Sequence, residues 1–489
     1  MTSADRQTVS NVVTWGVGLG FAHKVSSILL TLILVRLLSP EIYGQYGLVA
    51  AVLMFALAFS MQRFMEHSFH SASGSEDSYK YHLGFGILLH VGIFTVFNIA
   101  CFVLNLPENY DAVRFYLHIG SFSILLNIPR IYYSTHLRRT LDWRRQRILH
   151  LISFLLSAVV AIGMALSGFG VLALLAQNLL VPVPYIVDLV WRRPDMLECK
   201  LKFSYYKGAF KFGIVRSGSA FVVLGQKLIE ASAFTAIVGF SLFGIYGRAI
   251  GLGTLGAAWL ADQIHNLVYP ILAKVPRHSP QARSATGLVL RLAAWSSIPM
   301  AIALTLSSDA AVALLYGQKW DEVSPLLPAT LALAVITTIT TGLRLVLLTN
   351  YGPARVLFVD IALIVVCITG LYFALDQSVL FYCWFLVFGG TIVLAIVMLI
   401  LILEKILAID ELMLVFLPMF ISAGIAFIIA TNLEMQFYED HYPVTTLVAS
   451  ILATTALGLT AIRLFDPDGL RRVLAYLPAG PKITHLMRL

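Results

Sequence analysis

Basic residues inside long apolar segments are the part of this sequence best suited to chemistry. They outnumber the acidic residues found there. A charge at membrane depth is costly, so by default it faces a bundle interior or a water-filled cavity. A surplus of positive charge predicts a cavity for an anionic ligand, whereas an exporter of cationic drugs would place acids there. The predicted substrate-binding bases are Lys24, Arg63, Arg130, Arg216, Lys227, Arg248 and Arg344.

Lys24 is the leading cavity residue of this set, because it stands near the middle of its apolar segment with no carboxylate within a helical turn. Two other bases have an acid three residues further on, Glu66 after Arg63 and Glu230 after Lys227. Residues at this spacing are neighbours on a helix, so each pair can be an internal ion pair instead of a ligand site. Both interpretations stay open.

Asp262 and His265 lie one helical turn apart, beside Gln263 and Asn266. A protonatable pair at membrane depth can couple transport to protons or sodium. A packing network with satisfied hydrogen bonds is the alternative. The predicted ion-coupling residues are Glu66, Glu230, Asp262 and His265.

Other polar residues in the apolar segments have a structural explanation. Arg36 and Arg291 lie near segment ends, where a long side chain is expected to snorkel to the lipid headgroups. Asp188 is likewise near an end, and His90 is expected to be a packed core histidine. The sequence has no nucleophile triad, nucleotide-binding loop or metal-ligand spacing, and its cysteines are unpaired in pattern. We therefore expect no enzyme activity, no cofactor and no metal.

The composition requires a membrane for these charges. Hydrophobic residues make up 59% of the 489 residues and charged residues only 12%, against about a quarter charged in a soluble domain. A helix that crosses the hydrocarbon needs about 20 mainly apolar residues. The segments that meet this, about fourteen in number, lie near 11–36, 44–66, 82–104, 115–136, 149–167, 170–191, 212–237, 243–272, 286–306, 324–349, 356–375, 378–402, 412–431 and 444–464.

The loop charges predict how these helices are oriented. Bases gather in alternate loops, as cytoplasmic loops do, while acids gather in the others. The connection after the fourth segment, for example, holds Arg138, Arg139, Arg144, Arg145 and Arg147. Both termini are therefore expected in the cytoplasm of a multi-pass inner-membrane protein. The net charge of +8 is then mostly topological, which removes the case for a nucleic-acid partner.

An internal repeat divides the chain. Gly44, Tyr46 and Gly47 match Gly244, Tyr246 and Gly247 at an offset of 200 residues. Both copies precede an even-numbered predicted helix, so they face the same side of the membrane. Parallel halves related by an axis along the membrane normal are a transporter architecture. We predict six-helix lobes over 1–200 and 201–405, an added lipid-facing helix pair over 406–465 and a cytoplasmic tail over 466–489.

Three motifs in order resemble those of polysaccharide transporters. Residues 36–44 read Arg-Leu-Leu-Ser-Pro-Glu-Ile-Tyr-Gly, and residues 239–249 resemble the family's G-x-x-x-L-G-x-Y-x-x-A segment. Residues 315–320, Leu-Tyr-Gly-Gln-Lys-Trp, are followed by Pro-Leu-Leu at 325–327. The sequence resembles the polysaccharide-transport branch, with its Wzx-type flippases, of the multidrug/oligosaccharidyl-lipid/polysaccharide exporter superfamily. One departure is Glu230, which stands where many members carry aspartate.

The resemblance implies a flippase for polyprenyl-diphosphate-linked oligosaccharide, in O-antigen, capsule or exopolysaccharide synthesis. Transport would proceed by alternating access through a cationic central cavity. It also implies membrane lipids, a polysaccharide polymerase and chain-length machinery as partners. A cation-coupled drug antiporter of the same fold is the first alternative and would need unpaired acids in its cavity. A membrane-embedded enzyme is the second, and it would need a sizeable catalytic loop.

Overall fold

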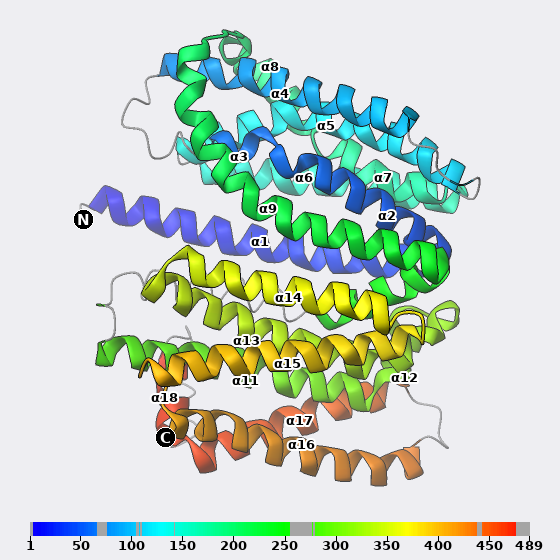
Figure 1. Cartoon of the computed structure of the whole chain (residues 1–489), viewed down its shortest axis with the longest axis vertical. Helices are drawn as coiled ribbons and strands as arrows, with labels where there is room; N and C mark the ends of the chain where they lie inside the picture. Colours follow the sequence, from blue (N-terminus) through cyan, green and yellow to red (C-terminus); the bar gives the residue numbers. More distant parts are fainter. Residues whose placement is uncertain are drawn as a thin grey trace. The chain divides into compact units, whose positions relative to one another are not determined.

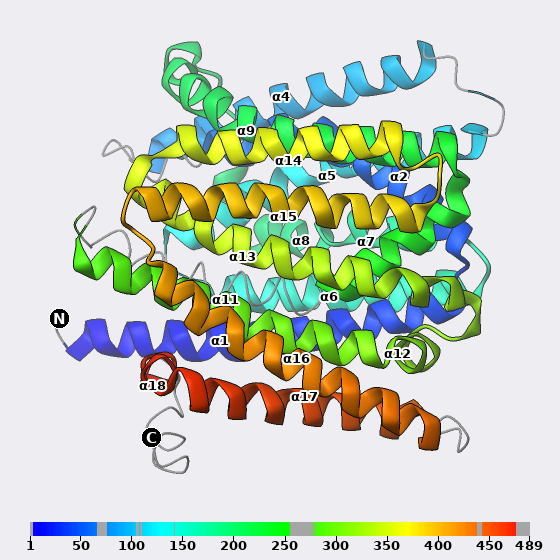
Figure 2. The ribbon, with the colours of Figure 1, turned by 60° about the horizontal axis from the view of Figure 1, so that its bottom comes forward.

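The computed structural model describes residues 3–65, 76–103, 107, 110–140, 142–254, 276, 279–437 and 443–475. Helices fill almost all of these residues (Figures 1 and 2). The apolar sequence explains this, because an unpaired backbone N–H or C=O in hydrocarbon is costly and a helix pairs these groups internally. The chain divides into two compact units, Met1–Gly244 and Ile245–Leu489, which are described in turn.

The first unit is built from long helices with two breaks. Its long helices are α1 (Ser3–Leu37), α2 (Pro40–Ala56), α4 (Glu76–Val103), α5 (Asp111–Arg139), α6 (Trp143–Leu166) and α9 (Phe203–Ile237). Shorter pieces are η1 (Leu57–Phe59), α3 (Met61–Met65), α7 (Val171–Leu180), α8 (Val183–Arg192) and η4 (Pro194–Leu197). Residues 239–254 are also helical and continue from this unit into the second at Ile245.

The second unit repeats this style of construction. Its elements are α11 (Pro280–Leu306), α12 (Ser308–Leu315), η5 (Gln318–Leu326), α13 (Leu327–Tyr351), α14 (Pro353–Phe373), α15 (Val379–Leu403), α16 (Ile409–Phe437), α17 (Pro443–Phe465) and α18 (Pro467–Ala475). A buried aliphatic core joins α11, α13 and α15, with Val289, Val346 and Val397 at its centre. Neighbours in the sequence, such as α16 and α17, pack side by side (Figure 2).

The predicted apolar segments coincide with these helices, although the eighth lies partly outside the described residues. Within the described part of the chain, 11 helices are long and apolar enough to cross a membrane. The protein is therefore an all-helical, multi-pass membrane protein. The number of fourteen, the cytoplasmic termini and the lobe boundaries stay predictions. The helix α9, assigned by prediction to the second lobe, packs in the first unit along α2 and α3 (Figure 1).

The second predicted span is broken at Ser60, between η1 and α3. His90 of α4 pins the break, because its Nε2 accepts a hydrogen bond from the Met61 backbone N–H at 3.1 Å. The other ring nitrogen, Nδ1, then carries the proton and donates to the Ile124 carbonyl at 2.7 Å. The imidazole is fully buried. The prediction of a packed core histidine is confirmed, and the ring satisfies an N–H that the broken helix leaves free.

The two repeated glycines lie against each other's chain. A side chain on Gly44 would overlap the carbonyl oxygen of Phe240, and one on Gly244 would overlap that of Pro40. Each glycine therefore rests on the carbonyl four residues before the other glycine. Only glycine lets two backbones approach this closely. The contact is reciprocal, since each copy of the motif offers its glycine to the backbone of the other copy.

We predict that Gly44→Ala lowers the stability of the purified protein in detergent by about 1–3 kcal/mol, the usual cost of overpacking. The control is Gly163→Ala in α6, where a Cβ would meet nothing within 4 Å. This control should leave the thermal midpoint equal or slightly higher, because alanine favours helix. Equal midpoints for both variants would contradict the close approach.

Arg291 of α11 forms a buried ion-pair network. Its Nε lies 2.7 Å from Asp466 Oδ2, and the two side chains are 5% and 6% exposed. Glu411 Oε1 of α16 lies 3.8 Å from the same guanidinium. The prediction that Arg291 snorkels to headgroups is wrong, because the carboxylates of two other segments surround it. The network joins α16 and the start of α18 to α11. The C-terminal helices are therefore held to α11 by ion pairs as well as by apolar contacts.

Arg291→Met should lower the free energy of unfolding by about 3–5 kcal/mol, because it leaves the buried Asp466 carboxylate without its partner. The matched control is Arg355→Met, since Arg355 pairs with Glu404 at 3.2 Å but both side chains are well exposed. Its loss should cost at most about 1 kcal/mol. Thermal unfolding followed by intrinsic fluorescence measures both, and similar shifts would refute the network's role.

Candidate anion-binding site

Four helices of the first unit bring basic side chains together. The helix α1 packs along α6, and α6 also contacts α5 and α8. Asp142 caps the start of α6 by accepting a hydrogen bond from the Arg145 backbone N–H at 3.1 Å. With its start fixed, α6 places Arg147 and His150 three residues apart on one face.

Two histidines form the centre of the site. His23 of α1 and His150 of α6 stack with ring centroids 4.3 Å apart and an interplanar angle of 27°. Phe154, one turn further along α6, meets the edge of His23 at 4.7 Å. The stack joins α1 to α6. Lys24 directly follows His23 in the sequence.

Permanent cations lie within electrostatic range of the stack. The charge of Arg147 acts on both histidines, that of Lys24 on His23 and that of Arg130 on His150. Arg138 lies within electrostatic range of Arg130, and the Tyr185 hydroxyl within range of all three arginines. We call Lys24, Arg130, Arg138 and Arg147, with the His23–His150 stack, the basic cluster.

The basic cluster lacks a balancing acid. Within the described part of the chain, Lys24 and the three arginines of the cluster form no ion pair. Like charges so close together repel one another, since low-dielectric surroundings screen them weakly. An anion bound among them would remove this repulsion.

Several donors of the cluster are also unused. Arg138 Nε and Arg147 Nε are buried and have no hydrogen-bond partner among the described residues. Arg130 Nε donates to Asn127 Oδ1 of the preceding turn at 2.7 Å, which orients its guanidinium. Native proteins satisfy nearly all buried polar groups, so orphaned donors call for an explanation. Guanidinium groups bind phosphate oxygens bidentately, and a phosphate-bearing ligand fits both the charge and the donors.

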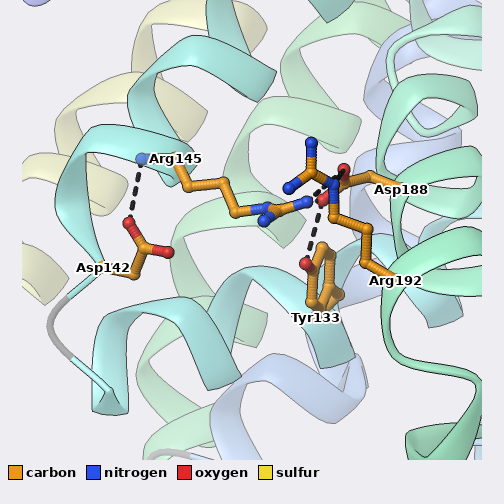
Figure 3. A network of polar contacts seen from close by, with 5 residues as sticks. All are labelled: Tyr133, Asp142, Arg145, Asp188 and Arg192. Atoms are coloured by element: carbon orange, nitrogen blue, oxygen red, sulfur yellow. Dashed lines mark hydrogen bonds and ion pairs between the residues drawn. The ribbon is translucent and has the colours of Figure 1, made fainter.

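A separate ion-pair network lies on the other side of α6 (Figure 3). Asp188 of α8 accepts from Arg145 Nε at 2.8 Å and from Nη2 at 2.5 Å. It also accepts from the Tyr133 hydroxyl of α5 at 2.9 Å. Asp188 was predicted only to lie near the end of its segment, and the structure adds three protein partners to that position. Its carboxylate fastens α5, α6 and α8 together and so holds the helices of the basic cluster in place.

Among the predicted cavity bases whose side chains the structure describes, Lys24 and Arg130 are the two that belong to the basic cluster. Arg63 lies on α3 and donates from Nε to the Ala58 carbonyl at 2.8 Å, across the break in its helix. In the second unit, Arg344 pairs with Asp360 at 2.5 Å, which balances its charge. Arg248 is half-buried, and its carbonyl accepts a hydrogen bond from Tyr316.

The remaining predicted residues are on α9 or outside the described residues. Lys227 is exposed and Glu230 half-buried on α9. The side chain of Arg216 and the residues Glu66, Asp262 and His265 lie outside what the structure describes. Their predicted roles in substrate binding and ion coupling stay predictions.

Sequence reasoning missed His23, Arg138, Arg147, His150 and Tyr185. The two arginines were interpreted as loop charges, whereas α5 continues to Arg139 and α6 begins at Trp143, so both are helical. The three-residue spacing of Arg147 and His150 was the available signal. The stack on His23 had no signal, because it joins helices that are far apart in the sequence.

Fold and site together define a multi-pass helical membrane protein whose first unit holds a cluster of bases without balancing acids. The model of the polysaccharide biosynthesis protein family matches residues 33–325, which is more than half of the chain. The chain therefore belongs to this family of polysaccharide transporters. It is 25% identical over 364 residues to the succinoglycan biosynthesis transport protein ExoT of Rhizobium meliloti (strain 1021), covering 71% of this chain and 70% of that protein.

Solved structures share the fold. The lipid II flippase MurJ in an inward closed conformation is similar with a TM-score of 0.70 and 12% identity, over 93% of this chain and 99% of that chain. An inward-facing multidrug resistance transporter of the MATE family, in the MOP superfamily, is similar with a TM-score of 0.58 and 14% identity. That match covers 77% of this chain and 93% of the other. These likenesses confirm the predicted all-helical membrane fold.

Arg130→Gln and Arg147→Gln should each weaken binding of inorganic pyrophosphate to the purified protein about tenfold or more, because each removes a charge-assisted hydrogen bond. Titration calorimetry at low salt measures the affinity, and raising the salt should weaken wild-type binding. Arg355→Gln, which alters an exposed arginine paired with Glu404, is the control. A cluster that does not bind anions would give the same affinity in all variants.

Proposed function

We propose that the chain is a flippase that moves polyprenyl-diphosphate-linked oligosaccharide repeat units across the inner membrane. The basic cluster is the observation that carries this proposal. A diphosphate that leaves water needs cations and hydrogen-bond donors along its path, and the cluster offers both without a competing acid. The family supports a polysaccharide substrate, and the name of the ExoT relative favours exopolysaccharide over O-antigen or capsule.

Transport in this proposal follows alternating access through a cationic cavity. Two six-helix lobes, an added helix pair and cytoplasmic termini form its framework of about fourteen helices. The reciprocal contact of Gly44 and Gly244 supports the repeat on which the lobes are based. Arg63, Arg216, Lys227, Arg248 and Arg344 are proposed as further cavity residues, and the predicted coupling acids and His265 as the ion site.

The setting of the proposal is the inner membrane, with membrane lipids around the protein. A polysaccharide polymerase and chain-length machinery are the proposed partners that use the flipped repeat units. The chain itself makes and breaks no bond in this scheme, so it acts as a transporter and not as an enzyme.

The charge pattern argues against a drug-cation antiporter, the alternative of the same fold. Such a cavity would need carboxylates free to meet a cation. Two acids in the predicted spans are instead paired with arginines, Asp188 with Arg145 and Asp360 with Arg344. The basic cluster, in contrast, is unpaired.

Lys24→Ala should abolish surface polysaccharide in a host that depends on this chain, with the protein at its normal level in the membrane. The reason is that Lys24 is the one cation of the cluster supplied by α1, opposite the arginines of α5 and α6. Surface polysaccharide measured by sugar analysis, with protein measured by immunoblotting, gives the result. Lys24→Arg should restore part of the export because it keeps the charge.

The control is Lys319→Ala, which removes an exposed lysine of η5 far along the chain. Normal export with Lys24→Ala would remove Lys24 from the mechanism. Export lost equally with Lys319→Ala would mean that the assay reports expression or folding. Lower accumulation of a cationic drug in wild-type cells than in cells that lack this protein would favour the antiporter.

A further inference from the structure

An apolar groove runs between α6 and α8 on the first unit. Leu149, Ile152 and Leu156 of α6 form one wall, and Val183 and Val187 of α8 form the other. The groove has a volume of about 620 Å³ and no polar side chain along most of its length. Its shape and lining suit a hydrocarbon chain, because apolar surface of this kind gains from contact with an acyl chain and offers nothing to water.

One end of the groove is polar and carries Asp188, Trp191 and Arg192. Trp191 is 83% exposed. Exposed tryptophans concentrate at the headgroup level of a membrane, where the ring is half in hydrocarbon and half in water. The polar end therefore marks the headgroup level, and the groove extends from it into the hydrocarbon.

Arg192 is the more loosely held of the two arginines at this end (Figure 3). The Asp188 carboxylate is already held by Nε and Nη2 of Arg145 and by the Tyr133 hydroxyl. Arg192 Nε stays 3.6 Å from the carboxylate, and its side chain is 66% exposed. Two guanidinium groups facing one carboxylate leave one positive charge, which Arg192 presents to the surroundings.

The groove is distinct from the basic cluster. On α6, Leu149, Ile152 and Leu156 form the groove wall, while Arg147 and His150 belong to the cluster. At 3.6 residues per turn, these two sets of positions lie on opposite sides of the helix. A lipid in the groove would therefore occupy the outside of the unit, away from the site proposed for the transported diphosphate.

We propose that this groove binds an anionic membrane phospholipid, with its phosphate on Arg192 and one acyl chain between α6 and α8. The chain supplies most of the affinity through apolar contact, and Arg192 supplies the preference for a negative headgroup. The negative Asp188 carboxylate repels a second phosphate group, so the site favours a lipid headgroup with a single negative charge. This assignment is independent of the substrate proposed for the basic cluster.

Native mass spectrometry of the full chain in detergent tests the proposal with palmitoyl-oleoyl phosphatidylglycerol and the zwitterionic phosphatidylcholine of the same chains. Wild type should bind phosphatidylglycerol about fivefold more tightly, as expected for one interfacial arginine. Arg192→Gln should remove this preference and leave phosphatidylcholine binding unchanged. The control Arg471→Gln alters an arginine of similar exposure, 54%, that also faces an aspartate, Asp468 at 3.5 Å; it should keep the preference.

A second variant tests the apolar part of the site. Val187→Trp fills the groove with a side chain that the lipid-facing surface tolerates, and it should reduce the binding of both lipids while Arg192 keeps its charge. The thermal midpoint of each variant is measured first, and only variants with the midpoint of the wild type are compared, so that misfolding is excluded.

Two results would overturn the assignment. Unchanged binding in Val187→Trp, or equal losses in Arg192→Gln and Arg471→Gln, would mean that lipids bind elsewhere. Displacement of phosphatidylglycerol from the wild type by an equal concentration of polyprenyl diphosphate would assign the groove to a prenyl chain, and the phospholipid proposal would fail.

Discussion

The cost of placing charge in hydrocarbon is the constraint on which the rest of this structure depends. Two of the described acids in the predicted spans, Asp188 and Asp360, are each held by an arginine, and so is Asp466 directly after α17. Each pair also joins separate helices, so it contributes to packing as well as to charge balance. The basic cluster is the exception. Its cations lack such partners, and this imbalance distinguishes a ligand site from a structural network.

Hydrophobic length and glycine pattern made the helical architecture predictable. The predicted segments coincide with the helices because a membrane span needs a long apolar run, and such runs are visible in a single sequence. The repeated glycines were visible for the same reason, since the motif is local. Helix breaks were not visible. The break at Ser60 is pinned by His90, which lies about four turns into another helix, and its role is set by a tertiary hydrogen bond.

Site residues were harder to predict, because pairing is a tertiary property. Arg344 and Arg130 look alike in sequence, each an arginine in an apolar run, yet Asp360 balances only the first. Arg291 was expected at the headgroups because the acids that hold it, Glu411 and Asp466, are more than a hundred residues away. The positive-inside pattern explained Arg138 and Arg147 so well that their second use, as cluster residues, was hidden.

The connection between α5 and α6 has a consequence for the energetics of transport. Three of the cluster's four cations, Arg130, Arg138 and Arg147, stand on this one helical hairpin, which Asp142 caps and Asp188 fastens to α8. A hairpin held in this way moves as one body. A bound anion would then meet nearly the same charges whichever side of the membrane the site faces. The affinity of the hairpin would be equal on both sides, so the direction of movement would come from the concentrations at the two surfaces or from α1, which carries Lys24 and His23.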